Sequence, residues 1–131
     1  MTIRATASAA VLLVAAGLAA APAQASQSML CRPLSGTGPM LNLLLAAGGG
    51  IGGANLMERG TTRSTFREPD GIEIRQSWID EHRVWVDLTD PQRMGDEGRL
   101  RGTFVRTGRH WHVAGTFVRA GRLYRVRCEE S

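Results

Sequence analysis

Residues 102–109 have the sequence GTFVRTGR, and residues 115–122 repeat it as GTFVRAGR with a single difference at the sixth position. A period of thirteen residues fits one β-strand plus one tight turn and is too short for the repeats of solenoid proteins. The repeat therefore predicts a meander of three antiparallel strands. Its turns are expected at Thr107-Gly108 and Ala120-Gly121, where glycine supplies the positive φ of tight hairpins.

Alternation along the meander divides its side chains between two faces. Loops of even length pair Phe104 with Trp111, Phe117 with Tyr124, Gly115 with Val126 and Val113 with Cys128. One face is then expected to form the core, and its residues are Leu100, Gly102, Phe104, Trp111, Val113, Gly115, Phe117, Tyr124, Val126 and Cys128.

The opposite face of the meander carries Arg99, Arg101, Arg125 and Arg127. In the expected register Ala114 lies between Arg101 and Arg127, and Thr116 lies between Arg99 and Arg125. Residues 99–127 hold eight Arg and no acid, whereas residues 68–97 hold nine acids and three Arg. Such a concentration of one sign attracts polyanions, and guanidinium groups suit bidentate contact with them. The alternative interpretation is that these arginines only keep exposed strands soluble and unpaired.

A second hairpin is expected around the loop 80–82. With three residues in this loop, the predicted pairs are Trp78 with Val84, Gln76 with Val86 and Ile74 with Leu88. This register gathers the apolar side chains on one face, and a slip by one residue would reverse every side chain. It also places Arg75 opposite Asp87 and points Trp85 outward, where an exposed aromatic ring indicates a candidate contact surface.

The first 25 residues have the three parts of a secretory signal, which are a basic start at Arg4, an apolar run over residues 9–21 and small residues at 23–25. We expect cleavage after Ala25, which leaves residues 26–131 as a single periplasmic or secreted domain. The apolar run falls short of the roughly 20 residues that a membrane span needs. The mature chain is therefore expected not to span a membrane.

Cys31 and Cys128 are the only cysteines of the chain. In an exported protein they predict one disulfide, which ties the start of the domain to its end. For a loop of about 100 residues, chain entropy gives a stabilisation of roughly 4 to 5 kcal/mol.

Strand-like segments recur along the whole domain. They are expected near residues 28–34, 40–47, 54–59, 61–67, 72–79, 83–89, 99–106, 109–119 and 122–128. This pattern predicts an all-β fold of about eight strands. A small antiparallel β-barrel is favoured over a β-sandwich, because a disulfide between the first and last strands forms most easily when those strands are neighbours.

No catalytic, cofactor or metal site is predicted. The glycine run at residues 48–53 matches the dinucleotide fingerprint only formally, because no helix follows it, and we interpret it as a connector. His110 and His112 lack an evident third metal ligand. The acids near the predicted loop 89–98 lack the spacing of a calcium loop and are expected to be solvated: Asp87, Asp90, Asp96 and Glu97.

In outline the predicted domain resembles the c-type lysozyme inhibitors, small periplasmic β-barrels that also have a signal peptide and a disulfide. Their Ser-Gly-x-x-Tyr loop has only residues 35–39 (SGTGP) as a counterpart, with Pro39 in place of the tyrosine. The resemblance therefore covers architecture and carries over no inhibitory residues.

Two functional hypotheses remain, both of them non-enzymatic. In the first, the domain binds an anionic envelope lipid or glycan, or an exported protein, through Arg99, Arg101, Arg125, Arg127 and Trp85. In the second, it inhibits an exported enzyme such as lysozyme. Nucleic acid is not expected as a partner.

Overall fold

The computed structural model describes residues 27–66, 71–92 and 95–131, and these residues form nine β-strands. The strands are β1 (Ser28–Pro33), β2 (Met40–Leu45), β3 (Ile51–Glu58), β4 (Thr61–Ser64), β5 (Glu73–Ile79), β6 (Arg83–Asp90), β7 (Gly95–Thr107), β8 (His110–Arg119) and β9 (Arg122–Glu130). Each overlaps one of the segments expected from the sequence. The predicted signal peptide lies outside the described residues.

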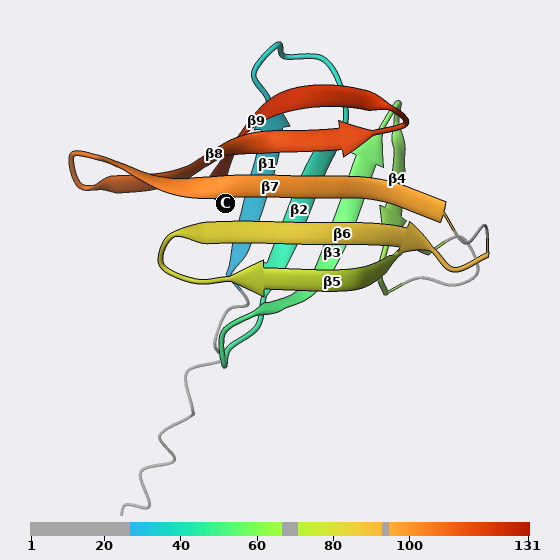
Figure 1. Ribbon diagram of the computed structural model, residues 1–131, viewed down its shortest axis with the longest axis horizontal. Coiled ribbons are helices and arrows are strands. Elements are labelled where there is room, and N and C mark those ends of the chain that lie inside the picture. Colours follow the sequence, from blue (N-terminus) through green and yellow to red (C-terminus); the bar gives the residue numbers. More distant parts are fainter. Residues whose placement is uncertain (1–26, 67–70, 93–94) are drawn as a thin grey trace, which may run out of the picture.

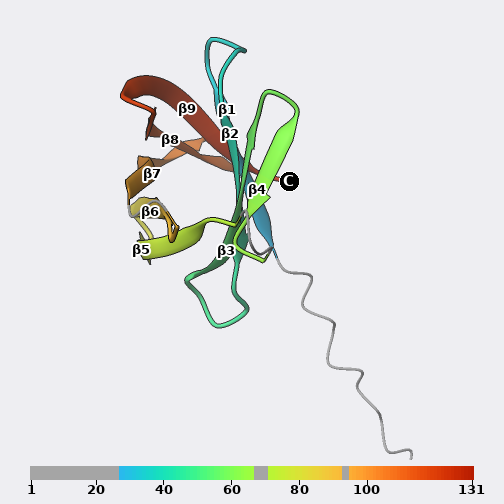
Figure 2. The ribbon, with the colours of Figure 1, turned by 90° about the vertical axis from the view of Figure 1, so that its right-hand side faces the viewer.

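All nine strands belong to one antiparallel sheet with the order β4-β3-β2-β1-β9-β8-β7-β6-β5. The sheet folds over on itself, so that β5–β9 form one curved layer and β1–β4 form the other (Figures 1 and 2). The two edges approach each other where β5 contacts β3 and the Ile72 N–H donates to the Ser64 carbonyl at 3.4 Å. The predicted small β-barrel is confirmed in this nearly closed form.

The enclosed core is apolar and draws on both layers. Its buried residues are Met29, Cys31, Leu41, Leu43, Ala54, Leu56, Ile72, Val84, Val86, Leu88, Leu100, Val113, Phe117, Val126 and Cys128. The first and last strands are neighbours, and Cys31 lies directly opposite Cys128 with their sulfur atoms bonded at 2.05 Å. The predicted disulfide is confirmed, and so is the predicted register of β8 against β9.

The predicted register of β7 against β8 is wrong by two residues. Phe104 pairs with Val113 rather than with Trp111, and the turn consists of Gly108 and Arg109. A shift by two leaves the alternation of faces unchanged, so most of the expected core residues still point inward. Trp111 is the exception, because it lies on the part of the hairpin that projects beyond the barrel and is 56% exposed.

The predicted register of β5 against β6 is also wrong over most of its length. Trp78 pairs with Trp85 and Ile79 with Val84, which requires a two-residue turn, and only the pair of Ile74 with Leu88 is confirmed. Ile74 and Ile79 are five residues apart and would face opposite sides of a regular strand. A β-bulge at Arg75 turns both toward the core, and Trp78 consequently lies outside, 50% exposed.

The glycine run at residues 48–53 forms the turn from β2 to β3 and the start of β3. Gly49 and Gly50 both have φ of +87°, a conformation that glycine adopts without steric cost. The run is therefore a hairpin connection.

Candidate binding face

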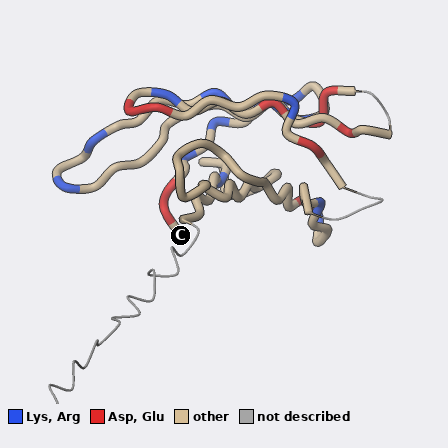
Figure 3. The backbone as a smooth tube through the Cα atoms, turned by 90° about the horizontal axis from the view of Figure 1, so that it is seen from below, with Lys and Arg blue, Asp and Glu red and all other residues tan. Residues whose placement is uncertain are grey.

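The strand pairing places aromatic and basic side chains in continuous rows on the outside of the barrel. One row crosses β5 to β9 and consists of Trp78, Trp85, Arg101, Thr116 and Arg125. The next row crosses β6 to β9 and reaches β1, and it consists of Arg83, Thr103, Ala114, Arg127 and Arg32. We term these ten residues the basic face. Figure 3 shows that the layer of β5–β9 has more charged positions than the layer of β1–β4, which is largely uncharged.

Small side chains occupy the middle of the basic face. Thr103, Ala114 and Thr116 lie there, and an open hollow of about 470 Å³ is lined by Arg83, Trp85 and Arg101 together with two of these small residues. Neighbouring strands lie roughly 4.8 Å apart, so Arg101 and Arg125 start about 10 Å apart on either side of β8. Arg83 and Arg101 bring two guanidinium groups to the lining of the hollow, and Arg125 lies outside that lining.

The aromatic end of the first row is held in place by its neighbours. The rings of Trp78 and Trp85 are 6.1 Å apart between centroids and tilted by 32°. The guanidinium carbon of Arg101 lies 5.5 Å from the centroid of the Trp85 ring, a cation–π distance. Trp78 Nε1 donates to Asp80 Oδ2 at 2.8 Å, which fixes the outer ring against the β5–β6 turn.

Asp87 neutralises part of the basic charge. Arg101 donates to its two oxygens at 2.7 and 3.2 Å, Arg99 Nε lies 3.5 Å away, and Gln76 also donates to it. Burial by itself raises the pKa of Asp87, but the hydrogen bonds from Arg101 and Gln76 and the nearby guanidinium charges lower it below its ordinary value. Asp87 therefore stays ionised and fixes Arg101 in position.

The arginines on β9 and β1 are less constrained. Arg127 Nε lies 2.5 Å from Glu129 Oε1, but both side chains are about half exposed, so this pair contributes little. Within the described ranges, the guanidinium groups of Arg125 and Arg32 have no hydrogen-bonded or ion-paired partner. The net positive charge of the basic face is concentrated on this side.

The structure places Arg99, Arg101, Arg125, Arg127 and Trp85 on the outer surface as the alternation predicted, but with different neighbours. Thr116 lies between Arg101 and Arg125, and Ala114 lies between Thr103 and Arg127. Arg99 instead aligns with Asp87 and Val118. The predicted pair of Arg75 with Asp87 is wrong, since Arg75 lies 3.5 Å from Asp96.

Sequence reasoning missed four members of the site, Arg32, Arg83, Trp78 and the buried anchor Asp87. Arg32 and Arg83 join the basic face only through pairing between strands, which the composition of their own strands does not reveal. The signal available for Trp78 was its spacing of one residue from Ile79, which implies opposite faces once Ile79 is assigned to the core.

A second charged group, which we term the ionic cluster, lies at one end of the barrel. Arg119 Nη2 is 2.6 Å from Glu58 Oε1, and Arg119 Nη1 is 2.7 Å from Glu97 Oε2. Arg63 contacts the same Glu97 oxygen at 3.1 Å and Asp90 at 2.9 Å. The hydrogen bonds to Glu58 raise the pKa of Arg119, against the effect of burial and with help from the charge of Glu97.

The ionic cluster corrects the prediction that the acids around residues 87–97 are solvated. Asp87, Asp90 and Glu97 are buried, and only Asp96 is exposed. The predicted long loop is short, since β6 continues to Asp90 and β7 begins at Gly95. Glu97 is the extra residue of a bulge between the pairs of Leu88 with Gly98 and Thr89 with Asp96, and the bulge aims its carboxylate at the arginines.

His110 and His112 are not joined by a third ligand: the part of the chain that the structure describes holds no group of three His, Cys, Asp or Glu residues placed to bind a metal ion. No helix in residues 27–66, 71–92 or 95–131 is long and apolar enough to cross a membrane. Comparison of the chain with models of protein families, with curated proteins and with solved structures finds no match.

Proposed function

We propose that this chain is an exported, non-enzymatic protein that binds an anionic glycan of the cell envelope on its basic face. The observation that supports this most directly is the row of Trp85, Arg101, Thr116 and Arg125 in register across four strands. It combines a flat ring, a fixed guanidinium, a small residue and an unpaired guanidinium along one line. The disulfide of Cys31 and Cys128 is compatible with the oxidising compartment that export implies.

The arrangement suits a glycan because it offers two kinds of contact side by side. The half-exposed indole ring of Trp78, with the partly buried ring of Trp85 beside it, can pack against the C–H face of a sugar ring, as aromatic rings do with flat apolar surfaces. Arg101 and Arg125 can then hold carboxylate or phosphate groups on neighbouring sugars by bidentate hydrogen bonds. Because Asp87 and Trp85 already fix Arg101, little side-chain entropy is lost when the ligand binds.

Calorimetric titration with oligogalacturonate, an anionic glycan, tests the proposal against the neutral oligosaccharide of equal length. We expect Arg125→Ser to weaken binding of oligogalacturonate about tenfold, the equivalent of ~1.4 kcal/mol. Arg122→Ser removes an equal charge from the same strand outside the basic face and serves as the matched control. Added salt should weaken binding, since exposed charges are screened.

The proposal fails if the double variant Arg125→Ser, Arg127→Ser binds oligogalacturonate as tightly as the unmodified chain. Equal binding of the neutral oligosaccharide would remove the anionic requirement. Binding of anionic lipid vesicles without binding of any glycan would show that the ligand class is wrong.

The alternative function, inhibition of an exported enzyme such as lysozyme, would use a loop. The connection from β1 to β2 presents Leu34, which is 65% exposed, and its backbone is fixed by positive φ at Gly36 and Gly38. A lysozyme assay with the protein in large molar excess tests this alternative, and full enzyme activity would remove it.

A further inference from the structure

The β7–β8 hairpin extends beyond the strands on both sides of it. Its last pair is Thr107 with His110, whereas the β6–β7 ladder stops at Thr103 and the β8–β9 ladder stops at Val113. Figure 1 shows the hairpin projecting from the barrel at the end opposite to the closing turn of β8 and β9. We term this projecting part of the hairpin, residues 104–112, the overhang. Its inner side continues the inner face of the barrel beyond the ends of the neighbouring ladders.

Apolar side chains continue along this inner face. Phe104 pairs with Val113, which is fully buried. Trp111 precedes Val113 by two residues and therefore lies on the same side of β8. Trp111 is 56% exposed although its face is the core face. Trp111 thus extends the apolar surface formed by Phe104 and Val113, and contiguous apolar surface that remains exposed marks a candidate binding site.

The overhang forms one wall of a cleft of about 570 Å³. Phe104, Trp111 and Val113 line it from the hairpin, and Met29 and Cys128 line it from β1 and β9. This volume lies within the range of roughly 300 to 1,000 Å³ that is common for small-molecule sites, and the mouth of a β-barrel is a frequent place for them.

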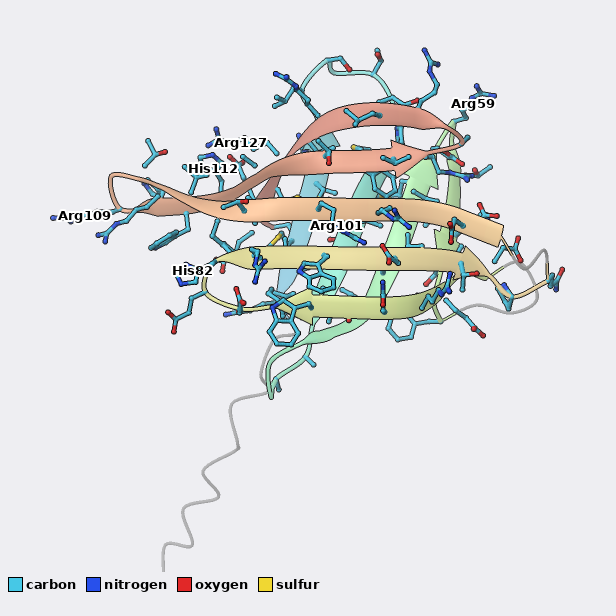
Figure 4. All side chains as sticks on the ribbon, viewed as in Figure 1. Arg59, His82, Arg101, Arg109, His112 and Arg127 are labelled. Atoms are coloured by element: carbon cyan, nitrogen blue, oxygen red, sulfur yellow. A yellow bond between two sulfur atoms is a disulfide. The ribbon has the colours of Figure 1, made fainter. Side chains whose placement is uncertain are left out.

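The charge at the rim of the cleft is positive on the hairpin side. Residues 104–112 contain Arg106 and Arg109, two His and no acid. Arg106 lies 5.7 Å from the Trp111 ring, and Arg109 has no hydrogen-bonded or ion-paired partner in the described part of the chain. Figure 4 shows Arg109 at the outer end of the hairpin.

The acids of the cleft lie on the other wall. Glu129 is paired with Arg127, and Glu130 lies opposite Met29 in the pairing of β9 with β1. In the described part of the chain, Arg109 is therefore the lining cation without an ion-pair partner on the hairpin wall, and Glu130 is the corresponding acid on the opposite wall.

We propose that this cleft binds an anionic amphiphile, a single apolar chain that ends in a carboxylate. The chain lies against Phe104, Trp111 and Val113, and the carboxylate pairs with Arg109. Arg127 of the basic face also lines the cleft, but Arg109 and Trp111 do not belong to the basic face, so variants at these two residues test this proposal separately from the glycan proposal.

Fluorescence of Trp111 provides the test. The chain contains three tryptophans, so the double variant Trp78→Phe, Trp85→Phe leaves Trp111 as its only tryptophan, which can be excited selectively over Tyr124. Titration of this variant with monomeric dodecanoate should give a saturable change in emission. Addition of Arg109→Ser should weaken binding at least about fivefold, as expected for the loss of one charge-assisted contact. Arg122→Ser, at the other turn, is the matched control and should change nothing.

Two further probes decide the chemistry. Dodecanol should bind more weakly than dodecanoate, and its affinity should not respond to Arg109→Ser. Dodecylammonium should also bind more weakly. The proposal is overturned if dodecanoate gives no saturable change, if Arg109→Ser leaves its affinity intact, or if dodecylammonium binds more tightly, which would assign control of the cleft to Glu130. Calorimetry on the unmodified chain should reproduce the dodecanoate affinity.

Discussion

One end of the barrel is closed and the other is open, although β8 supplies an inward-facing residue to each. Arg119, near the end of β8, lies in the ionic cluster and bonds to Glu58 and Glu97. Trp111, eight residues earlier on the same face of β8, lines an open cleft. The closed end joins β3, β4, β6, β7 and β8 through charges, whereas the open end has the disulfide of β1 with β9 nearby. Whether an inward-facing residue at a barrel end is covered or exposed therefore depends on the groups that lie opposite it.

Removing the disulfide tests the join near the open end and should have the largest effect. The double variant Cys31→Ser, Cys128→Ser is expected to lose about 2 to 5 kcal/mol of unfolding free energy, because a loop of 97 residues is no longer closed in the unfolded chain. Urea denaturation measures this. Addition of a reductant to the unmodified chain should reproduce the loss, and an unchanged midpoint in both experiments would contradict it.

Removing the central cation of the ionic cluster tests the closed end. Arg119→Met should lower the unfolding free energy by about 1 to 3 kcal/mol, because Glu58 and the buried Glu97 lose hydrogen bonds from a charged donor. The control is Arg75→Met, whose pair with Asp96 is exposed on both sides and should cost less than about 1 kcal/mol. Equal losses in the two variants would show that the cluster does not close the barrel.

Trp111, the inward-facing residue of β8 at the open end, should contribute little to the free energy of unfolding. Trp111→Ser is expected to change the unfolding free energy by less than about 1 kcal/mol, since more than half of the ring already contacts solvent. The same urea series measures it. A loss as large as that of Arg119→Met would indicate that the projecting hairpin is part of the packed core, and the contrast between the ends would disappear.

Acid should affect the turn beside the open end through Asp80. The hydrogen bond from Trp78 Nε1, followed by those from the N–H groups of His82 and Arg83, lowers the pKa of Asp80 to about 2. Its unfolded pKa is about 3.9, so its stabilisation is complete above about pH 4 and is lost as the pH falls through about 2. Asp80→Asn should reduce this acid-dependent loss.

Thermal unfolding at several pH values between about 6 and 2 compares this variant with Glu81→Gln, its sequence neighbour. The Glu81 variant should follow the unmodified chain. If all three proteins lose stability in parallel, Asp80 is not the group responsible.

Much of the fold follows from periodicity. All nine segments overlap strands of the structure, and the core face of β9 is the predicted one. The β7–β8 register could not be predicted, because a shift by two residues keeps every side chain on the same face and so leaves the alternating pattern unchanged. The bulges at Arg75 and Glu97 could not be predicted from their own strands either. The first brings both Ile74 and Ile79 to the core, and the second aims the Glu97 carboxylate at arginines of other strands.

The candidate sites divide in the same way. Alternation placed the arginines of β7 and β9 on one outer surface, but their neighbours depended on the β7–β8 register. Asp87 and Glu97 were expected to be solvated, yet both are buried against arginines from other strands. Arg119 shares the inward side of Phe117, which was visible in the sequence, but its partner Glu58 is 61 residues away.

From the sequence alone an all-β domain with its first and last strands joined could be predicted, with a barrel favoured over a sandwich, because side-chain alternation and cysteine chemistry are local properties of the chain. The tertiary structure alone decided which arginines are neutralised, which remain free and which end of the barrel stays open. The physical reason is that the strength of a charge and the exposure of an apolar ring depend on the groups that face them, and here those groups come from strands distant in sequence.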